Sequence, residues 1–243
     1  MKIKMIGTGA VYAKENNSSC LVDDKILIDC GNGIFKALLK QNISINDLDT
    51  LLITHIHGDH FLDLPFLILQ RSVFPSETKL NIYGPVGLEK TYEQIMNLIY
   101  SDIKDLKLIK NKANISFIEF DSLDNQEICP GYFATSYNVL HGNFSPSYGF
   151  TIKHKNKTLG LSGDSAYCEN IEKIVQISDI SILDTTFING TSGHMGAHDI
   201  EKLANTYNKR IIPTHLSPSS KEYLIKNKIN NIIVLNDGEI IKI

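Results

Sequence analysis

The sequence predicts an α+β fold in which two mixed β-sheets face each other and helices cover their outer faces. Three observations predict it. Short apolar runs of strand length recur along the chain, helical patterns separate them in both halves, and no linker or repeat divides the 243 residues. Hydrophobic residues make up 42% of the chain and charged residues 21%, which is enough to bury a core. Because this length suits one large domain, we expect a single domain over residues 1–243.

The first half opens with strands and then alternates strands with helices. Asp23 and Asp24 separate two β-rich runs and predict a tight hairpin, whereas Ile34, Ala37 and Leu38 recur at helical spacing. The expected strands cover residues 2–6, 18–23, 25–29, 50–54 and 79–83, and the expected helices cover 33–41, 61–72 and 86–100.

The second half continues the same mixture. The expected strands cover residues 114–120, 132–140, 147–154, 157–162, 179–184 and 210–213, and the expected helices cover 167–177, 198–208 and 219–227. The last twelve residues, 232–243, predict a hairpin with Asn236, Asp237 and Gly238 at its turn.

Composition excludes several classes of protein. With 24 basic and 27 acidic side chains the net charge is −3, which argues against a protein that coats nucleic acid electrostatically. The four cysteines form no CxxC pair, which is typical of free thiols in a reducing compartment. The apolar run at 61–69 is too short for a membrane helix, and the N-terminus suits a strand and turn better than a signal peptide. We therefore expect a cytoplasmic protein without membrane association.

The most informative segment follows the strand predicted to end at Thr54. Four potential metal ligands lie within the next six residues, and Gly58 allows a sharp turn among them. Imidazole and carboxylate groups suit borderline divalent cations. These ligands are His55, His57, Asp59 and His60.

Three further candidates come at the ends of apolar runs far apart in the sequence: His141, Asp164 and His215. Any one of them alone commonly caps a turn. Strand ends on one rim of a sheet, however, are where a site is assembled from distant segments. We therefore expect these three side chains to join the His55–His60 string.

The string Ile53-Thr54-His55-Ile56-His57-Gly58-Asp59-His60, followed in order by His141, Asp164 and His215, resembles the metallo-β-lactamase superfamily of two-metal hydrolases. Within it the chain is most similar to ribonuclease Z and its small phosphodiesterase relatives. The segments that indicate this subgroup are Ile6-Gly7-Thr8-Gly9, Tyr83-Gly84-Pro85, Asp184-Thr185-Thr186-Phe187 and Gly193-His194 before Ala197.

The resemblance implies an αββα sandwich with its site on one edge between the sheets. It also implies that one metal is held by His55, His57 and His141, the second by Asp59, His60 and His215, and that Asp164 bridges them. No cysteine stands at a ligand position, which weighs against antibiotic hydrolysis. A homodimer is expected from the family alone.

Two divalent cations, with zinc expected first and manganese or iron as alternatives, can share a water and convert it to a bridging hydroxide. We therefore predict a metal-dependent phosphodiesterase of ribonuclease Z type that uses a metal-bridging hydroxide, with Asp59 and His194 as its catalytic residues. His194 matches the subgroup's general acid, which protonates the leaving alkoxide. A lactone, ester or thioester hydrolase on the same scaffold is the alternative, and a metal-binding regulatory protein without catalysis is the third.

We expect the chain to differ from ribonuclease Z in how it contacts RNA. The family's basic tRNA-binding arm lies between the third histidine and the bridging aspartate, but here only residues 142–163 separate them, and two predicted strands occupy that span. The lysines between 104 and 112 alternate with acidic residues and predict a solvated helix face or loop. We expect a small phosphodiester or ester substrate and doubt that tRNA binds.

Overall fold

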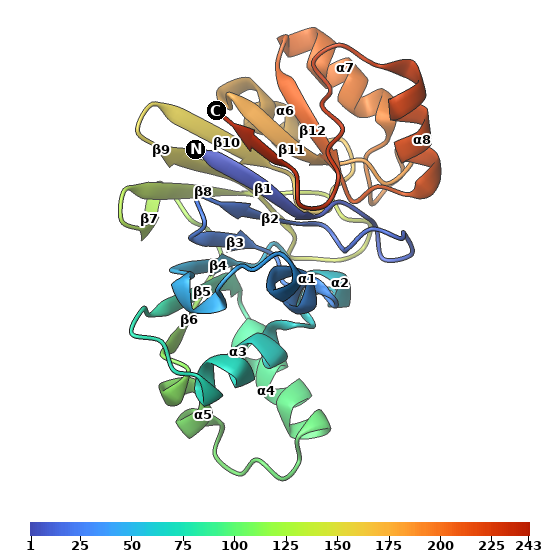
Figure 1. Ribbon diagram of the computed structural model, residues 1–243. Helices are drawn as coiled ribbons and strands as arrows, with labels where there is room; N and C mark the ends of the chain where they lie inside the picture. Colours follow the sequence, from blue (N-terminus) through green and yellow to red (C-terminus); the bar gives the residue numbers. More distant parts are fainter.

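Two β-sheets pack face to face in the computed structural model, which describes residues 1–243 (Figure 1). The first sheet has the order β13-β1-β2-β3-β4-β5-β6 and the second the order β12-β11-β10-β9-β8-β7. The strands of the first sheet are β1 (Lys2–Gly7), β2 (Ser19–Val22), β3 (Ile26–Ile28), β4 (Thr50–Leu52), β5 (Leu80–Pro85), β6 (Ile115–Phe120) and β13 (Ile240–Lys242). The strands of the second are β7 (Gln126–Cys129), β8 (Tyr132–Asn138), β9 (Tyr148–His154), β10 (Lys157–Leu161), β11 (Ile180–Asp184) and β12 (Arg210–Thr214).

Helices cover the outer face of each sheet. The first sheet carries α1 (Ile34–Lys40), α2 (Gly58–Phe61), α3 (Leu64–Val73), α4 (Leu88–Ile99), α5 (Leu106–Lys112) and the short 3₁₀ helix η1 (Ile45–Asp47). Figure 1 shows α3, α4 and α5 below the strands. The second sheet carries α6 (Glu169–Ile177), α7 (Ala197–Tyr207) and α8 (Pro218–Asn227). None of these helices combines the length and apolar character needed to cross a membrane.

Alternation along the strands separates the buried side chains into layers. In β1, Ile3 and Met5 lie in the core between the sheets, whereas Ile6 lies in the core beneath α1 and α3. The period of two along a strand sends successive side chains to opposite faces, so one strand serves both cores. A third core lies under α6, α7 and α8. These three cores lie between the four layers of an αββα sandwich, which is the fold that the resemblance implies.

The predicted strands and helices form at the predicted places, with ends that differ by a few residues. The predicted hairpin forms: Asp23 and Asp24 both adopt positive φ, the Lys25 N–H donates to Val22 O at 3.0 Å, and residues 23–25 connect the paired residues Val22 and Ile26. Three elements were not predicted: the strand β7, the short helix α2 and the 3₁₀ helix η1. β7 is an edge strand whose first two residues are exposed, so it has no apolar pattern, and α2 begins within the metal-ligand string itself.

The predicted C-terminal hairpin is wrong. Its first arm forms no strand: Ile211 donates its N–H to Asn231 O and accepts from Ile233 N, each at 2.8 Å, at the edge of the second sheet. Its second arm, β13, pairs antiparallel with β1 in the first sheet. The two arms therefore bind different sheets, because each open strand edge offers more backbone partners than a solvated hairpin would. The result places both chain ends side by side, with the Met1 amine 2.8 Å from Ile243 O (Figure 1).

A buried arginine ties the helical layer to the first sheet. Arg71 on α3 is fully buried and donates three hydrogen bonds to backbone carbonyls, at 3.0 Å to Ala113, 2.7 Å to Ile45 and 2.5 Å to Thr78. These carbonyls belong to three separate segments: the start of η1, the loop before β5 and the end of α5. One guanidinium therefore satisfies acceptors that would otherwise be buried without a donor.

We expect Arg71→Met to lower the free energy of unfolding by about 3 kcal/mol, because three carbonyl oxygens lose their donors. Urea unfolding followed by circular dichroism measures the change. Arg210→Met is the matched control: Arg210 is exposed and its side chain makes no hydrogen bond or ion pair, so the expected change is below ~0.5 kcal/mol. Equal losses for the two variants would contradict the bridging role of Arg71.

Candidate metal centre

The histidine string leaves the first sheet at the carboxyl end of β4. His55 and His57 lie in the loop after the strand, and Asp59 and His60 lie on α2. Gly31 packs directly against this helix, since a Cβ at that position would lie 1.7 Å from Asp59 O. The Cys30 N–H also donates to His60 O at 2.7 Å. The loop after β3 thereby fixes α2 in place.

The second sheet supplies the other three candidates from the ends of β8, β10 and β12. These strands run in one direction, because β8 and β10 are both antiparallel to β9 and β12 lies parallel to β11 beside β10. Carboxyl ends of such strands meet at one edge of the sheet. His141, Asp164 and His215 therefore reach the same edge, where they meet the string from β4.

The first group of ligand atoms comes from three histidines. Nδ1 of His57 lies 3.0 Å from Nε2 of His55 and 3.0 Å from Nε2 of His141. All three atoms lie within 4.8 Å of one another. His55 and His141 are buried, and His57 is partly exposed. Three ring nitrogens thus converge on one point.

The second group comprises Asp59, His60, Asp164 and His215, again with ligand atoms within 4.8 Å. Nε2 of His215 lies 3.2 Å from Asp59 Oδ2 and 3.4 Å from Asp164 Oδ2. Asp164 also reaches the first group, with Oδ2 3.9 Å from His141 Nε2 and 4.0 Å from His55 Nε2. The structure thus brings together all seven predicted ligand residues, with Asp164 between the two groups.

The protonation and pairing of these side chains suit the binding of a divalent cation. Nε2 of His60 is buried and has no hydrogen-bond partner, and an unpaired buried nitrogen is costly unless something binds it. Burial lowers the pKa of His55 well below its usual range and the neighbouring His60 lowers it further, so its ring is neutral and offers a lone pair. Burial opposes ionisation of Asp164, yet His215 and His60 hold its pKa well below the usual range. Neutral imidazoles and ionised carboxylates are the donors that divalent transition metals prefer.

Two buried aspartates orient the histidines, and sequence reasoning gave neither of them this role. Asp29, directly after β3, accepts from His60 Nδ1 at 2.7 Å and from the Thr54 hydroxyl at 2.9 Å. Because the Thr54 hydroxyl donates there, it accepts from His55 Nδ1 at 3.0 Å. Both histidines therefore carry their proton on Nδ1 and direct Nε2 to the centre. Asp29 ends an apolar strand, which is the signal by which Asp164 was found.

Asp184, at the end of β11, does the same for the second sheet. It accepts from the Thr186 hydroxyl at 2.7 Å, which in turn accepts from His215 Nδ1 at 2.7 Å. His141 donates its Nδ1 proton to Gly193 O at 2.8 Å. His215 and His141 consequently also present Nε2 to the centre.

His194 lies beside the metal ligands rather than among the two main groups. Its Nδ1 donates to Asp184 Oδ2 at 2.8 Å, and its ring stacks on that of His215 with centroids 5.3 Å apart. Partial burial opposes protonation, but the hydrogen bond to Asp184 raises the pKa of His194. The side chain is 22% exposed. A protonated imidazole at the mouth of the centre can therefore donate a proton to a bound molecule.

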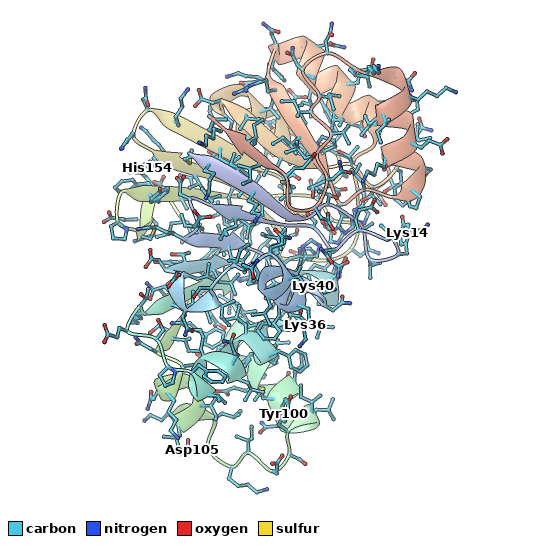
Figure 2. The ribbon with its side chains drawn as sticks, viewed as in Figure 1. Lys14, Lys36, Lys40, Tyr100, Asp105 and His154 are labelled. Carbon is cyan, nitrogen blue, oxygen red and sulfur yellow. The ribbon has the colours of Figure 1, made fainter.

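The other histidines lie outside the centre. His198 donates or accepts through both nitrogens, to Asn189 Oδ1 at 2.9 Å and to the Tyr223 hydroxyl at 3.0 Å. His154 stacks on Tyr132 with centroids 4.1 Å apart, at the edge of the molecule away from α1 (Figure 2). Neither is placed to bind a metal with the seven.

Comparison with known proteins gives matches over nearly the whole chain. The family described as anti-Pycsar protein Apyc1 matches residues 1–240. Ribonuclease Z of Listeria monocytogenes serotype 4a (strain HCC23) is 28% identical over 204 residues, which cover 78% of this chain but only 63% of that protein, less than two thirds of its length.

Two solved structures superpose on the chain. Human tRNase Z, short form, does so with a TM-score of 0.74 at 23% identity, covering 100% of this chain and 99% of that one. The metallo-β-lactamase fold protein YhfI from Bacillus subtilis gives a TM-score of 0.77 at 20% identity and covers 99% and 98% of the two chains. These likenesses show the metallo-β-lactamase fold.

We expect purified protein to carry close to two transition-metal ions per chain, and Asp164→Ala to lose both, because one carboxylate contacts both groups of ligand atoms. Elemental analysis of protein prepared without chelator measures the ratio. Asp121→Ala removes an exposed aspartate after β6 and should leave the metal content unchanged. Metal-free wild-type protein that gains none on addition of zinc or manganese would contradict this prediction.

Proposed function

Since the chain belongs to the family of the anti-Pycsar protein Apyc1, we propose that it is a metal-dependent phosphodiesterase of small phosphodiesters. We also propose that residues 1–243 form a single domain, which carries this activity. The observation that carries the proposal is the pairing of His194 with Asp184 beside the seven convergent ligands. A proton donor next to a cation site suits a reaction in which a poor alkoxide leaves. The relatives named ribonuclease Z support the same class of reaction.

Residues with convergent atoms would hold two divalent cations, with zinc expected first for this histidine-rich set. His55, His57 and His141 would hold one, Asp59, His60 and His215 the other, and Asp164 both. When bound, the cations activate water as a nucleophile and neutralise the charge that gathers on the phosphate.

Two carboxylates belong to the second group of ligand atoms, and Asp59 is the less buried of them. Its side chain is 15% exposed, whereas that of Asp164 is 4% exposed. Burial would raise the pKa of Asp59, but the hydrogen bond from His215 lowers it, so the group is ionised at neutral pH. Only its Oδ2 is engaged by His215. Its Oδ1 is free to accept a proton from the attacking water and so to orient it.

His194 is the group that would protonate the leaving oxygen. Its Nδ1 is committed to Asp184, so Nε2 carries the transferable proton. The carboxylate of Asp184 is completely buried and stabilises the imidazolium before transfer. This arrangement favours a phosphodiester over the alternative lactone, ester or thioester substrates, whose cleavage depends less on such a donor. It also favours an enzyme over a metal-binding regulatory protein.

The span between His141 and Asp164 supports a small substrate. β9 and β10 occupy most of it, joined by a tight turn at Lys155 with positive φ, and leave only residues 142–147 and 162–163, which are too few for an RNA-binding arm. The lysines near 104–112 offer little substitute, because Lys110 is paired with Glu89 and Glu93 at 2.6 and 2.7 Å. A net charge of −3 gives no general attraction for a polyanion.

We further propose that the chain forms a homodimer through α2 and α3. Phe66 and Val73 on α3, with Leu62 directly after α2 and Phe74 directly after α3, are exposed, Val73 by 66% and Phe74 by 61%. Their inward neighbours Leu67 and Ile68 fill the core, so the helix is apolar on both sides. A helix that is apolar on both sides is expected to be covered on both, and a second copy of this surface is the partner that closed symmetry favours.

His194→Ala should keep both metals but lose on the order of 10²–10⁴-fold in turnover of phosphodiesters with poor leaving groups. Substrates that release nitrophenolate need little protonation and should lose much less. His198→Ala is the matched control, since that histidine lies four residues further on and outside the centre. Steady-state rates on alkyl and nitrophenyl diesters measure the difference, and equal losses on both would remove the general-acid role.

A substrate panel tests the proposed activity. We expect the metal-loaded protein to hydrolyse bis(p-nitrophenyl) phosphate and small nucleotide diesters faster than a lactone or a thioester, and to cleave precursor tRNA weakly or not at all. Cleavage of precursor tRNA is followed on a gel at physiological salt. Efficient cleavage with sub-micromolar binding would overturn the small-substrate assignment, and hydrolysis of the lactone or thioester alone would favour the alternative.

Phe66→Glu should convert the dimer to a monomer, because a charge would be buried at the centre of the α2–α3 surface. Light scattering coupled to size exclusion measures the mass. Leu98→Glu is the control: Leu98 is 82% exposed on α4, near Tyr100, which Figure 2 shows at the far end of the molecule from α8. A wild-type protein that is monomeric at micromolar concentration would contradict the dimer.

A further inference from the structure

His57 differs from the other histidines of the two ligand groups in how its ring is held. The other four each donate an Nδ1 proton to an acceptor within the protein, which fixes the direction of the ring. These four are His55, His60, His141 and His215. His57 turns its Nδ1 to the centre instead, and its Nε2 has no hydrogen-bond partner within the protein. It is also the only one of the five that is partly exposed. No hydrogen bond to a group outside the centre therefore prevents its ring from turning away.

The ring of Phe144 packs against this otherwise unrestrained imidazole. The two ring centroids lie 3.9 Å apart and the planes are inclined by 46°. Phe144 is the closest ring neighbour of His57, because the rings of His55 and His141 lie at 4.7 and 4.9 Å. Close-packed rings cannot turn past each other without one of them moving. Phe144 therefore restricts the rotation of the His57 ring.

Phe144 is fixed in turn by the segment that carries His141. The Phe144 N–H donates to His141 O at 2.9 Å, and the Gly142 N–H donates to Ser192 O at 3.0 Å. Gly142 has a φ of +55°, which glycine adopts at little cost. This turn places a metal-ligand candidate at one end and the aromatic ring at the other. The second sheet thereby supplies the ring that packs on a histidine of the first.

Phe144 packs against the first group of ligands alone. Its ring centroid lies 5.5 Å from that of His55 and 6.0 Å from that of His141, in addition to its contact with His57. The rings of His60 and His215, which belong to the second group, are not among its ring neighbours. The contact therefore distinguishes one predicted cation site from the other.

We propose that Phe144 is a positioning residue that holds the His57 ring in its metal-binding orientation and so sets the affinity of the first cation site independently of the second. It takes the place of the hydrogen-bond acceptor that orients each of the other four histidines. The inference rests on the pair of cations in the proposed function and not on the identity of the substrate. Groups that orient a metal ligand contribute about 10- to 100-fold to metal affinity.

Competition for zinc between the metal-loaded protein and a chelating dye tests the inference without relying on turnover. We expect Phe144→Ala to bind one of the two ions about 10- to 100-fold more weakly and the other with unchanged affinity. Phe144→Leu, which is smaller but keeps the position apolar, should weaken the same ion, and Phe144→Tyr, which keeps the ring, should restore the wild-type affinity. Phe187→Ala is the matched control. Phe187 is also a half-buried aromatic, but it lies edge-on to His194 at 6.0 Å, so both affinities should stay unchanged.

A double-mutant cycle shows whether Phe144 acts through His57, with circular dichroism as the check that each variant is folded. In a His57→Ala background, Phe144→Ala should cause no further loss, because the ring that it positions is absent. An undiminished loss in that background, unchanged affinities in Phe144→Ala, or equal weakening of both ions would overturn the positioning role while leaving the two-cation centre intact. Wild-type protein that binds no zinc would refute that centre together with the inference.

Discussion

The carboxylate of Asp164 is the point on which the geometry of the site depends. It lies within 4.0 Å of a ring nitrogen of five histidines: His55, His60, His141, His194 and His215. These histidines come from both sheets and from four separate segments of the chain. A buried carboxylate is stable only among such partners, so Asp164 and the histidines hold one another in a common geometry. That geometry can form only when the two sheets pack face to face with these strand ends at the same edge of the sandwich.

Two buried aspartates, one after a strand of each sheet, orient the histidines in the same way. Asp29 after β3 holds His60 directly and His55 through the Thr54 hydroxyl. Asp184 at the end of β11 holds His194 directly and His215 through the Thr186 hydroxyl. Each sheet thereby uses one buried carboxylate to fix the protonated nitrogen of two imidazoles. The difference between the two is exposure: His60 is buried among the candidate ligands, whereas the His194 side chain is 22% exposed, as its proposed role of proton donor requires.

The C-terminal segment joins the two sheets close to the same edge. Ile232 pairs beside β12, and β13 pairs with β1. Asp237, between these two segments, accepts hydrogen bonds from the Thr8 and Asn16 N–H groups and so fixes the loop after β1. The position of that loop beside the centre thus depends on the last residues of the chain. The mispredicted hairpin and the position of the loop after β1 have one physical origin, since residues 232–243 divide their backbone partners between the sheets instead of pairing with themselves.

Local pattern by itself determined most of the strands and helices, though not β7, α2, η1 or the partners of residues 232–243. The spacing of ligands in His55–His60, with the strand-end positions of His141, Asp164 and His215, determined the candidate metal ligands. These depend on side-chain period and on residue type, which neighbouring residues reveal. Only the tertiary structure decided that Asp29 and Asp184 orient the histidines, and that His57 presents Nδ1 where the others present Nε2. Each of these depends on contacts between segments that fold together from distant parts of the chain, and the strength of such a contact is set by burial and distance rather than by the order of the residues.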